Sequence, residues 1–260
     1  MTSLLGAIHE SRYAQSQLES RSKILSWSHR RRFATAMRLA GEVGGARMLD
    51  YGCGDATFLD LLTQSESAPR VAVGAERWPS ALEVCRERFR ARKGLHFILT
   101  EDLERPAHAG SYDAIYCMEV LQYVTDPASV LEQFDRLLAD GGALVISVPV
   151  ETGLPLVVKQ IVRRVAGWRG IGLYPGTSRY TLSEFWKSVI AGSTPHITRP
   201  TLTRADGSTY HDHTGFNWRV LRGLIRDRFD LVSEMASPVA RLGPNLAAQC
   251  WFVARKRKTA

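Results

Sequence analysis

The side chains best suited to chemistry gather in residues 50 to 57, where an apolar run meets a turn that contains two glycines. Gly52 and Gly54 can adopt positive φ, and because they lack a Cβ atom they let a ligand approach the main chain closely. Asp50 stands just before the turn. Glu76 follows Gly54 by 22 positions and ends the next apolar run, where nucleotide-binding folds carry a ribose-binding carboxylate. The spacing predicts a cradle for a nucleoside.

The turn is acidic and departs from the dinucleotide-binding pattern. A GxGxxG sequence would have its third glycine at position 57, but the chain has Thr57 there, and Ala56 does not replace it. Asp50 and Asp55 place two carboxylates beside the turn. They would repel a diphosphate and favour a ligand that carries an ammonium or sulfonium group. These features disfavour a nucleotide-dependent oxidoreductase.

Further blocks follow the turn in a fixed order. With Leu49–Asp55 and Glu76, they are residues 111–116, 119–124 and 137–149. In this order and spacing the chain resembles the class I S-adenosylmethionine-dependent methyltransferases, in particular the small-molecule group with ubiquinone-type and sugar-modifying members. The likeness covers roughly residues 45 to 150. Relatives of this group often carry Glu-His where this chain has Gln122-Tyr123, so a role that rests on that histidine is absent.

Apolar runs alternate with helical patterns from Arg47 onwards, which predicts a parallel sheet covered on both faces. We expect strands over 47–51, 70–75, 95–99, 112–117 and 143–149, and helices over 56–64, 78–91, 127–139 and 215–228. Two last strand-like runs, 231–240 and 246–255, flank a turn-rich connector and predict a hairpin. The resemblance implies an α/β Rossmann-like methyltransferase fold, with a doubly wound, seven-stranded, mostly parallel sheet and an antiparallel C-terminal hairpin strand.

The domain organisation follows from these patterns. Residues 8–43 become amphipathic at helical spacing, so we expect an N-terminal helical extension over 1–45 and one S-adenosylmethionine-binding methyltransferase domain over 46–260. The segment from about 151 to 213 is too long for a plain connection and is expected to form a substrate lid.

The resemblance implies S-adenosylmethionine as the cofactor and assigns its binding residues. The glycine turn would pass under the methionine part, Asp50 would orient the ammonium group, and Glu76 would bind the ribose hydroxyls. The adenine pocket would come from Arg77 or Trp78 and from Glu101 or Asp102, with both choices open. The full set is Asp50, Gly52, Cys53, Gly54, Glu76, Arg77, Trp78, Glu101, Asp102, Met118 and Glu119. The structural alternatives are a turn-stabilising role for Asp50, a solvated strand end at Glu76, and a helix cap at Glu119.

A hydroxyl acceptor can require a general base, and carboxylates or histidines at the carboxyl ends of strands are the candidates. Glu151, directly after the fifth strand, is the first choice, followed by His211 and His213. Each also fits a structural role, as a hydrogen-bonding partner or a capping residue. We expect no metal, because two histidines at i and i+2 lack a clear third ligand.

The formal net charge of +8 indicates attraction to an acidic partner. Segment 154–169 has apolar residues opposite Lys159, Arg163 and Arg164, which suits either a helix at an anionic membrane surface or a lid helix that packs on the domain. The acceptor is therefore expected to be a small molecule or a lipid-linked molecule, with O-methylation favoured. Nucleic acid is disfavoured, since stacking aromatics do not interleave the basic segments. The rival function is a catalytically inactive S-adenosylmethionine-binding partner or regulatory protein.

Four cysteines without metal-site spacing predict reduced structural thiols. The N-terminal apolar stretch is too short for a signal peptide, and no apolar run approaches 18 residues. We therefore expect a cytoplasmic protein that is able to touch a membrane. The residues leave open the identity of the acceptor, the atom that is methylated and the oligomeric state.

Overall fold

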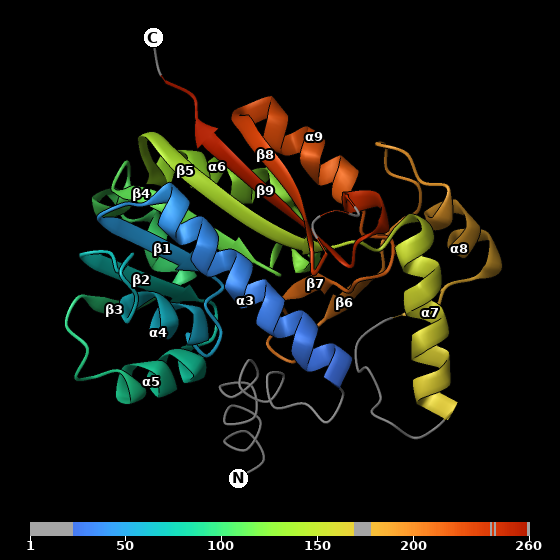
Figure 1. The fold of residues 1–260 in the computed structure, drawn as a ribbon, viewed down its shortest axis with the longest axis horizontal. Coiled ribbons are helices and arrows are strands. Elements are labelled where there is room, and N and C mark those ends of the chain that lie inside the picture. Colours follow the sequence, from blue (N-terminus) through green and yellow to red (C-terminus); the bar gives the residue numbers. More distant parts are fainter. Residues whose placement is uncertain (1–22, 169–177, 240, 242, 259–260) are drawn as a thin grey trace. The chain divides into compact units, whose positions relative to one another are not determined.

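The computed structural model describes residues 23–168, 178–239, 241 and 243–258 (Figure 1). These residues form two compact units. Unit 1 contains the described residues up to Met118, then 133–146 and those from 253 onwards. Unit 2 contains 119–132 and the described residues of 147–252.

Unit 1 is built on parallel strands whose apolar runs are buried, as expected for strands covered on both faces. β1 pairs in parallel with β2 and with β4, and β2 pairs in parallel with β3. Helix α5 packs on β2 and β3, and α3 contacts α4 (Figure 1). The bounds are α3 Lys23–Val43, β1 Arg47–Tyr51, α4 Thr57–Thr63, β2 Val71–Glu76, α5 Pro79–Arg88, β3 Leu95–Leu99, η1 Thr100–Glu104, η2 Pro106–His108 and β4 Tyr112–Met118.

The whole sheet has seven strands in the order β3-β2-β1-β4-β5-β9-β8. Strands β5 (Leu138–Pro149) and β9 (Gln249–Lys256) each run from one unit into the other, and β8 is Phe229–Ser237. The sheet is mostly parallel with antiparallel C-terminal strands, so the predicted fold class is confirmed. β5 begins five residues earlier than predicted, because Leu138–Gly142 belongs to the strand although Gly141 is left-handed at φ 70.

Aromatic packing holds the interior of unit 1. The ring of Tyr51 meets that of Phe134 edge-on at 4.9 Å between centroids, and Phe58 lies 5.0 Å from Tyr116. All four cysteines of the chain are buried free thiols. These contacts fix the carboxyl ends of β1 and β4, where ligands bind in open α/β sheets.

Unit 2 contains the predicted lid segment and its surroundings. Its elements are η3 Leu121–Tyr123, α7 Gly153–Trp168, α8 Leu182–Val189, β6 Thr201–Thr203, β7 Thr209–His211, α9 Trp218–Arg228 and η5 Pro244–Leu246, while α6 Pro127–Leu137 starts in unit 2 and ends in unit 1. β6 and β7 form a short antiparallel hairpin. Helix α8 begins with a capping box in which Thr181 and Glu184 bond each other's backbone N–H groups.

The predicted start of the helix over 215–228 differs from the structure, and the predicted N-terminal extension reaches beyond the described residues. Helix α9 begins at Trp218 rather than 215, because Gly215 has φ 73 and the Asn217 side chain caps the helix through the Arg219 N–H. The expected N-terminal helical extension is described from Lys23 onwards as α3, and residues 1–22 lie outside the described residues, as does Arg169. Within the described part of the chain, no helix is long and apolar enough to cross a bilayer.

Candidate functional site

The turn after β1 takes positive-φ conformations at both glycines, and the space beside Gly54 is open. Gly52 and Gly54 have φ 77 and 55, and Ala56 is also left-handed at φ 58. The N–H groups of Gly52 and Cys53 both donate to the carbonyl of Ala75, at 2.8 and 3.1 Å, which ties the turn to β2. A Cβ atom added at Gly54 would meet no heavy atom within 4 Å, so a ligand can approach this backbone.

A buried carboxyl group lies next to this turn. Asp50 is 2% exposed, and burial, followed by the charges of Glu76 and Asp55, raises its pKa to about 8. Glu76 Oε2 accepts from the Gly54 N–H at 3.0 Å, and its Oε1 accepts from the Arg77 N–H at 2.7 Å. Each of these oxygens keeps a further lone pair for a hydroxyl donor. A cationic ligand would stabilise the ionised form of Asp50, so these residues fit a nucleoside with an ammonium or sulfonium group.

The candidates for an adenine pocket follow β2 and β3 directly. Arg77 is exposed, and its guanidinium lies 5.8 Å from the ring centroid of the half-buried Trp78. The Asp102 carboxylate accepts from the Leu99 N–H at 3.2 Å and pairs with Arg105 at 2.6 Å. Glu101 is exposed in η1. Hydrogen bonds within η1 therefore engage Asp102, and both carboxylates stay candidates.

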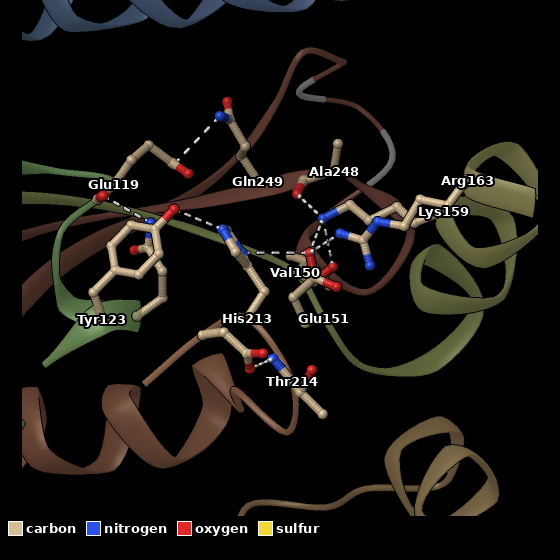
Figure 2. A network of polar contacts seen from close by, with 12 residues as sticks. Glu119, Tyr123, Val150, Glu151, Lys159, Arg163, His213, Thr214, Ala248 and Gln249 are labelled. Atoms are coloured by element: carbon tan, nitrogen blue, oxygen red, sulfur yellow. Dashed lines mark hydrogen bonds and ion pairs between the residues drawn. The ribbon is translucent and has the colours of Figure 1, made fainter. Parts of the chain in front are cut away.

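The chain after β4 carries a strained residue. Met118 ends the strand half-buried, and Glu119 then adopts φ 58, which is unusual for a residue with a side chain. Its carboxylate Oε1 accepts from Ser147 Oγ at 3.2 Å. The same oxygen accepts from Gln249 Nε2 at 3.3 Å (Figure 2). A strained backbone held by side-chain hydrogen bonds is typical of functional sites.

Unit 2 places two of the three predicted acid–base candidates together (Figure 2). Glu151 is 1% exposed, and its Oε1 lies 2.9 Å from Lys159 Nζ, 3.4 Å from Arg163 Nη2 and 3.8 Å from His213 Nδ1. Burial raises the pKa of Glu151, but the charges of these neighbours outweigh burial and lower it. A buried carboxylate stabilised in this way accepts protons poorly.

His213 has a second, closer partner. Its Nε2 lies 2.8 Å from the hydroxyl oxygen of Tyr123, and the two rings meet edge-on (Figure 2). Burial lowers the pKa of His213, the Glu151 charge raises it, and the Lys159 and Arg163 charges lower it, with a net decrease. The imidazole is therefore neutral near pH 7 and is able to accept a proton.

The third candidate lies apart from this pair. His211 is in β7, and its Nδ1 contacts the backbone carbonyl of Pro200 at 2.9 Å. Between the two histidines, Asp212 accepts from the Thr214 N–H at 2.7 Å and also from the Ser178 N–H. Among the residues that the structure describes, no group of three or more His, Cys, Asp or Glu side chains is arranged to hold a metal ion.

Sequence reasoning did not identify Tyr123, Lys159 or Arg163 as partners in this cluster. The basic residues were expected on a helix face opposite the apolar one, but α7 directs Lys159 and Arg163 towards Glu151 (Figure 2). The apolar side of α7 is partly exposed, with Ile161 and Val162 each 57% exposed, whereas Leu156 is buried. A buried acid eight residues before Lys159 was the available signal for this orientation.

Three comparisons relate the chain to known proteins. Residues 24–187, more than half of the chain, match the model of a family described as Methyltransferase domain. A ubiquinone biosynthesis O-methyltransferase from Psychrobacter arcticus is 30% identical over 107 residues, which are 40% of this chain and 41% of that protein. The chain thus spans less than half of this relative's length.

Solved structures share the fold at low sequence identity. The PH0226 protein from Pyrococcus horikoshii OT3 has a TM-score of 0.56 at 13% identity, over 93% of this chain and 95% of that one. N-methyltransferase NodS from Bradyrhizobium japonicum WM9, in complex with S-adenosyl-L-homocysteine, has a TM-score of 0.52 at 13% identity, over 95% of this chain and 98% of that one.

Proposed function

Given that the chain belongs to the methyltransferase-domain family, with the class I S-adenosylmethionine-dependent fold, we propose that it methylates a hydroxyl group of a small-molecule or lipid-linked acceptor. The observation that carries the proposal is the open glycine turn beside a buried acid whose pKa is raised. Such a turn lets a nucleoside lie against the main chain, and the carboxylate favours a nucleoside that carries a positive charge.

In this proposal, residues of unit 1 hold the donor. The backbone at Gly52–Gly54 lies under its methionine part, Asp50 orients the ammonium group, and Glu76 accepts from the ribose hydroxyls with its remaining lone pairs. Arg77 or Trp78 and Glu101 or Asp102 would surround the adenine, and Met118, which ends β4, and Glu119 after it complete the set. When bound, S-adenosylmethionine would supply a methyl group on a sulfonium sulfur. The acceptor oxygen would take the methyl group in an in-line displacement, and the sulfur would become a thioether.

The acceptor part of the proposal rests on unit 2. Tyr123 and His213 provide a neutral hydrogen-bonded pair suited to a hydroxyl acceptor, and the relative from Psychrobacter arcticus is named as an O-methyltransferase. A catalytically inactive donor-binding protein is the alternative, and no observation in either unit favours it. A protein that only binds the donor would not need the Tyr123–His213 pair as an acid and base.

We also propose that α7 and α8 touch an anionic membrane surface on the cytoplasmic side. Large apolar side chains with more than half of their surface exposed lie along both helices: Leu154, Val158, Ile161, Val162, Leu182 and Trp186. Helices α7 and α8 contact each other, and α7 contains no acidic residue. Exposed apolar stripes next to basic residues suit the headgroup boundary of a bilayer, and the free thiols suit a reducing compartment.

The donor site is tested by Gly54→Val. A valine Cβ would occupy the backbone approach, so the affinity for S-adenosylmethionine and S-adenosylhomocysteine should fall at least about 100-fold, a loss of about 3 kcal/mol of binding free energy. Isothermal titration calorimetry measures the loss, with NAD as the ligand expected not to bind. Gly207→Val is the matched control, because Gly207 also has positive φ and open space around it. Both substitutions place a β-branched residue at positive φ and so introduce a similar backbone strain.

The proposal fails if Gly54→Val binds the donor as the wild-type protein does, or if NAD binds in place of S-adenosylmethionine. Methyl transfer is then followed by the S-adenosylhomocysteine that forms from S-adenosylmethionine when catechols or polyprenylated phenols are supplied as acceptors. Tight donor binding with no turnover on any acceptor would favour the inactive binding protein.

A further inference from the structure

The glycine turn of unit 1 is bound by helix α5 through two successive carbonyl groups. The Gly54 carbonyl accepts from Cys85 Sγ at 3.4 Å. The Asp55 carbonyl accepts from Arg88 Nη1 at 3.2 Å. The two donors are three residues apart on α5 and therefore lie on the same side of the helix. The partners are 31 and 33 positions apart in the sequence, so these contacts depend on how α5 packs within unit 1.

The two donors differ in strength. A thiol is a weak hydrogen-bond donor, whereas a guanidinium group makes a charge-assisted hydrogen bond. The carbonyl that Arg88 binds belongs to Asp55, which is only 4% exposed, so water can replace the lost donor only poorly. Arg88 therefore contributes most of the restraint that α5 places on the turn, and Cys85 adds a weaker contact beside it.

Helix α5 is itself fixed on the sheet by contacts that do not involve the turn. Arg86 donates to the carbonyl of Phe97 in β3 from both Nε, at 3.2 Å, and Nη2, at 2.9 Å. Leu82 is fully buried on the same helix. Arg88 Nη2 also lies 3.5 Å from a carboxylate oxygen of Asp60 in α4. One guanidinium group thus joins an anchored helix to the turn and to the helix that follows the turn.

The turn needs such support because its conformation is unfavourable for part of its sequence. Ala56 has φ 58 although it carries a Cβ atom, and it directly follows the carbonyl that Arg88 binds. Backbone of this kind persists where the surrounding structure fixes it. On the opposite side, the N–H groups of Gly52 and Cys53 donate to the Ala75 carbonyl. The turn is therefore restrained by β2 through its N–H groups and by α5 through its carbonyls.

We propose that Arg88 is a positioning residue for the methyl donor. By holding the Asp55 carbonyl, it keeps the main chain at Gly52–Gly54 in the one arrangement against which the methionine part of S-adenosylmethionine lies. This inference rests on the proposed function, and Arg88 acts on the donor through the turn. Loss of Arg88 should therefore weaken ligands that have the amino acid part of the donor more than ligands that lack it.

Calorimetry on full-length Arg88→Met with two ligands tests the proposal. The affinity for S-adenosylhomocysteine should fall about tenfold, because the turn is then in its binding arrangement for only a fraction of the time. The affinity for methylthioadenosine, which has the nucleoside without the amino acid part, should change by less than about threefold. A general loss of stability would weaken both ligands alike. The Arg88 side chain is 40% exposed, so the variant should fold, and thermal unfolding checks that it does.

Two matched controls separate the contact with the turn from the other contacts of Arg88 and α5. Asp60→Asn removes the ion pair with Arg88 but keeps the hydrogen bond to the Asp55 carbonyl. Arg86→Met removes a guanidinium–carbonyl contact of the same helix that lies away from the turn. Both should bind S-adenosylhomocysteine within about threefold of the wild-type affinity, even where the Tm falls.

The possible results distinguish this proposal from the proposed function. Arg88→Met that binds S-adenosylhomocysteine as the wild type does, or that weakens both ligands equally, overturns the positioning role. An equal loss of affinity in either control overturns it as well. Wild-type protein that fails to bind S-adenosylhomocysteine contradicts the proposed function, and the positioning role falls with it.

Discussion

At the scale of single residues, Asp50 is the side chain most clearly prepared for a ligand. It is a buried acid beside two further carboxylates, Glu76 and Asp55, and its pKa is about 8 instead of 3.8. A folded pKa above the unfolded value means that the protonated form is stabilised by folding. This stability is fully present below pH 3.8 and is lost as the pH rises through 8. The donor's positive charge would offset the loss.

Asp50→Asn should therefore stabilise the unliganded protein and weaken donor binding. At pH 8.5 the Tm should rise by roughly 3 to 8 °C, and at pH 4 the difference should nearly vanish. The affinity for S-adenosylmethionine at pH 8.5 should fall at least tenfold, because the ammonium loses its counter-charge. Differential scanning calorimetry and binding titrations measure both effects. Asp206→Asn, in an exposed turn, is the control, and a similar response in both variants would contradict the role of Asp50.

The glycine turn of unit 1 and the Tyr123–His213 contact of unit 2 were not equally predictable. Asp50, the glycines and Glu76 belong to one local strand–turn–helix–strand pattern, so their spacing in the sequence carries the information. The match over residues 24–187 confirms the family that these blocks predicted. The Tyr123–His213 contact depends instead on how the segment with β6 and β7 folds back onto η3 within unit 2. Such a contact has no local signal.

At the scale of elements, helix α7 is held by its charged side. Lys159 Nζ contacts Glu151 and also donates to the carbonyls of Val150 and Ala248, so one ammonium group joins α7 to the chain after β5 and to the chain before β9. Glu151 is buried, and loss of Lys159 would leave Arg163 at 3.4 Å and the neutral His213 at 3.8 Å beside it. Unpaired buried charge is costly.

Lys159→Met should lower the free energy of unfolding by about 2 to 3 kcal/mol, less than for a fully buried pair because Arg163 remains. Urea unfolding followed by tryptophan fluorescence measures the change. Arg164→Met, one residue beyond Arg163 and exposed, is the matched control and should change stability by less than about 0.5 kcal/mol. Equal effects would mean that the pair with Glu151 does not hold the helix.

The limits of sequence reasoning at this scale have physical causes. The parallel strands were predicted within a residue or two because each is a buried apolar run. The start of β5 was wrong because Asp140-Gly141-Gly142 has turn chemistry but stays in the sheet. The orientation of α7 was left open because amphipathic periodicity shows that two faces exist but not which one is buried, and here Lys159 and Arg163 of the basic face pair with a buried acid.

At the scale of the whole molecule, the charge balance bears on where the protein works. The formal net charge is +8, and Arg164 and Lys187 lie exposed on the two helices that carry the exposed apolar side chains. Apolar contact with a bilayer is insensitive to salt, whereas attraction to anionic headgroups is screened within about 8 Å at physiological ionic strength. The two contributions can therefore be measured separately.

Binding is measured by co-sedimentation with vesicles that contain about 30% phosphatidylglycerol. It should weaken about tenfold between roughly 0.05 and 0.5 M salt. Weaker, salt-independent binding should remain on phosphatidylcholine alone. Ile161→Glu or Trp186→Glu should remove both, since a charge on the apolar stripe must stay in water. Val232→Glu is the matched control, because Val232 is 63% exposed but lies on β8. Failure of the wild-type protein to bind anionic vesicles at low salt would exclude the membrane surface, leaving donor binding and the acceptor chemistry to be judged in solution.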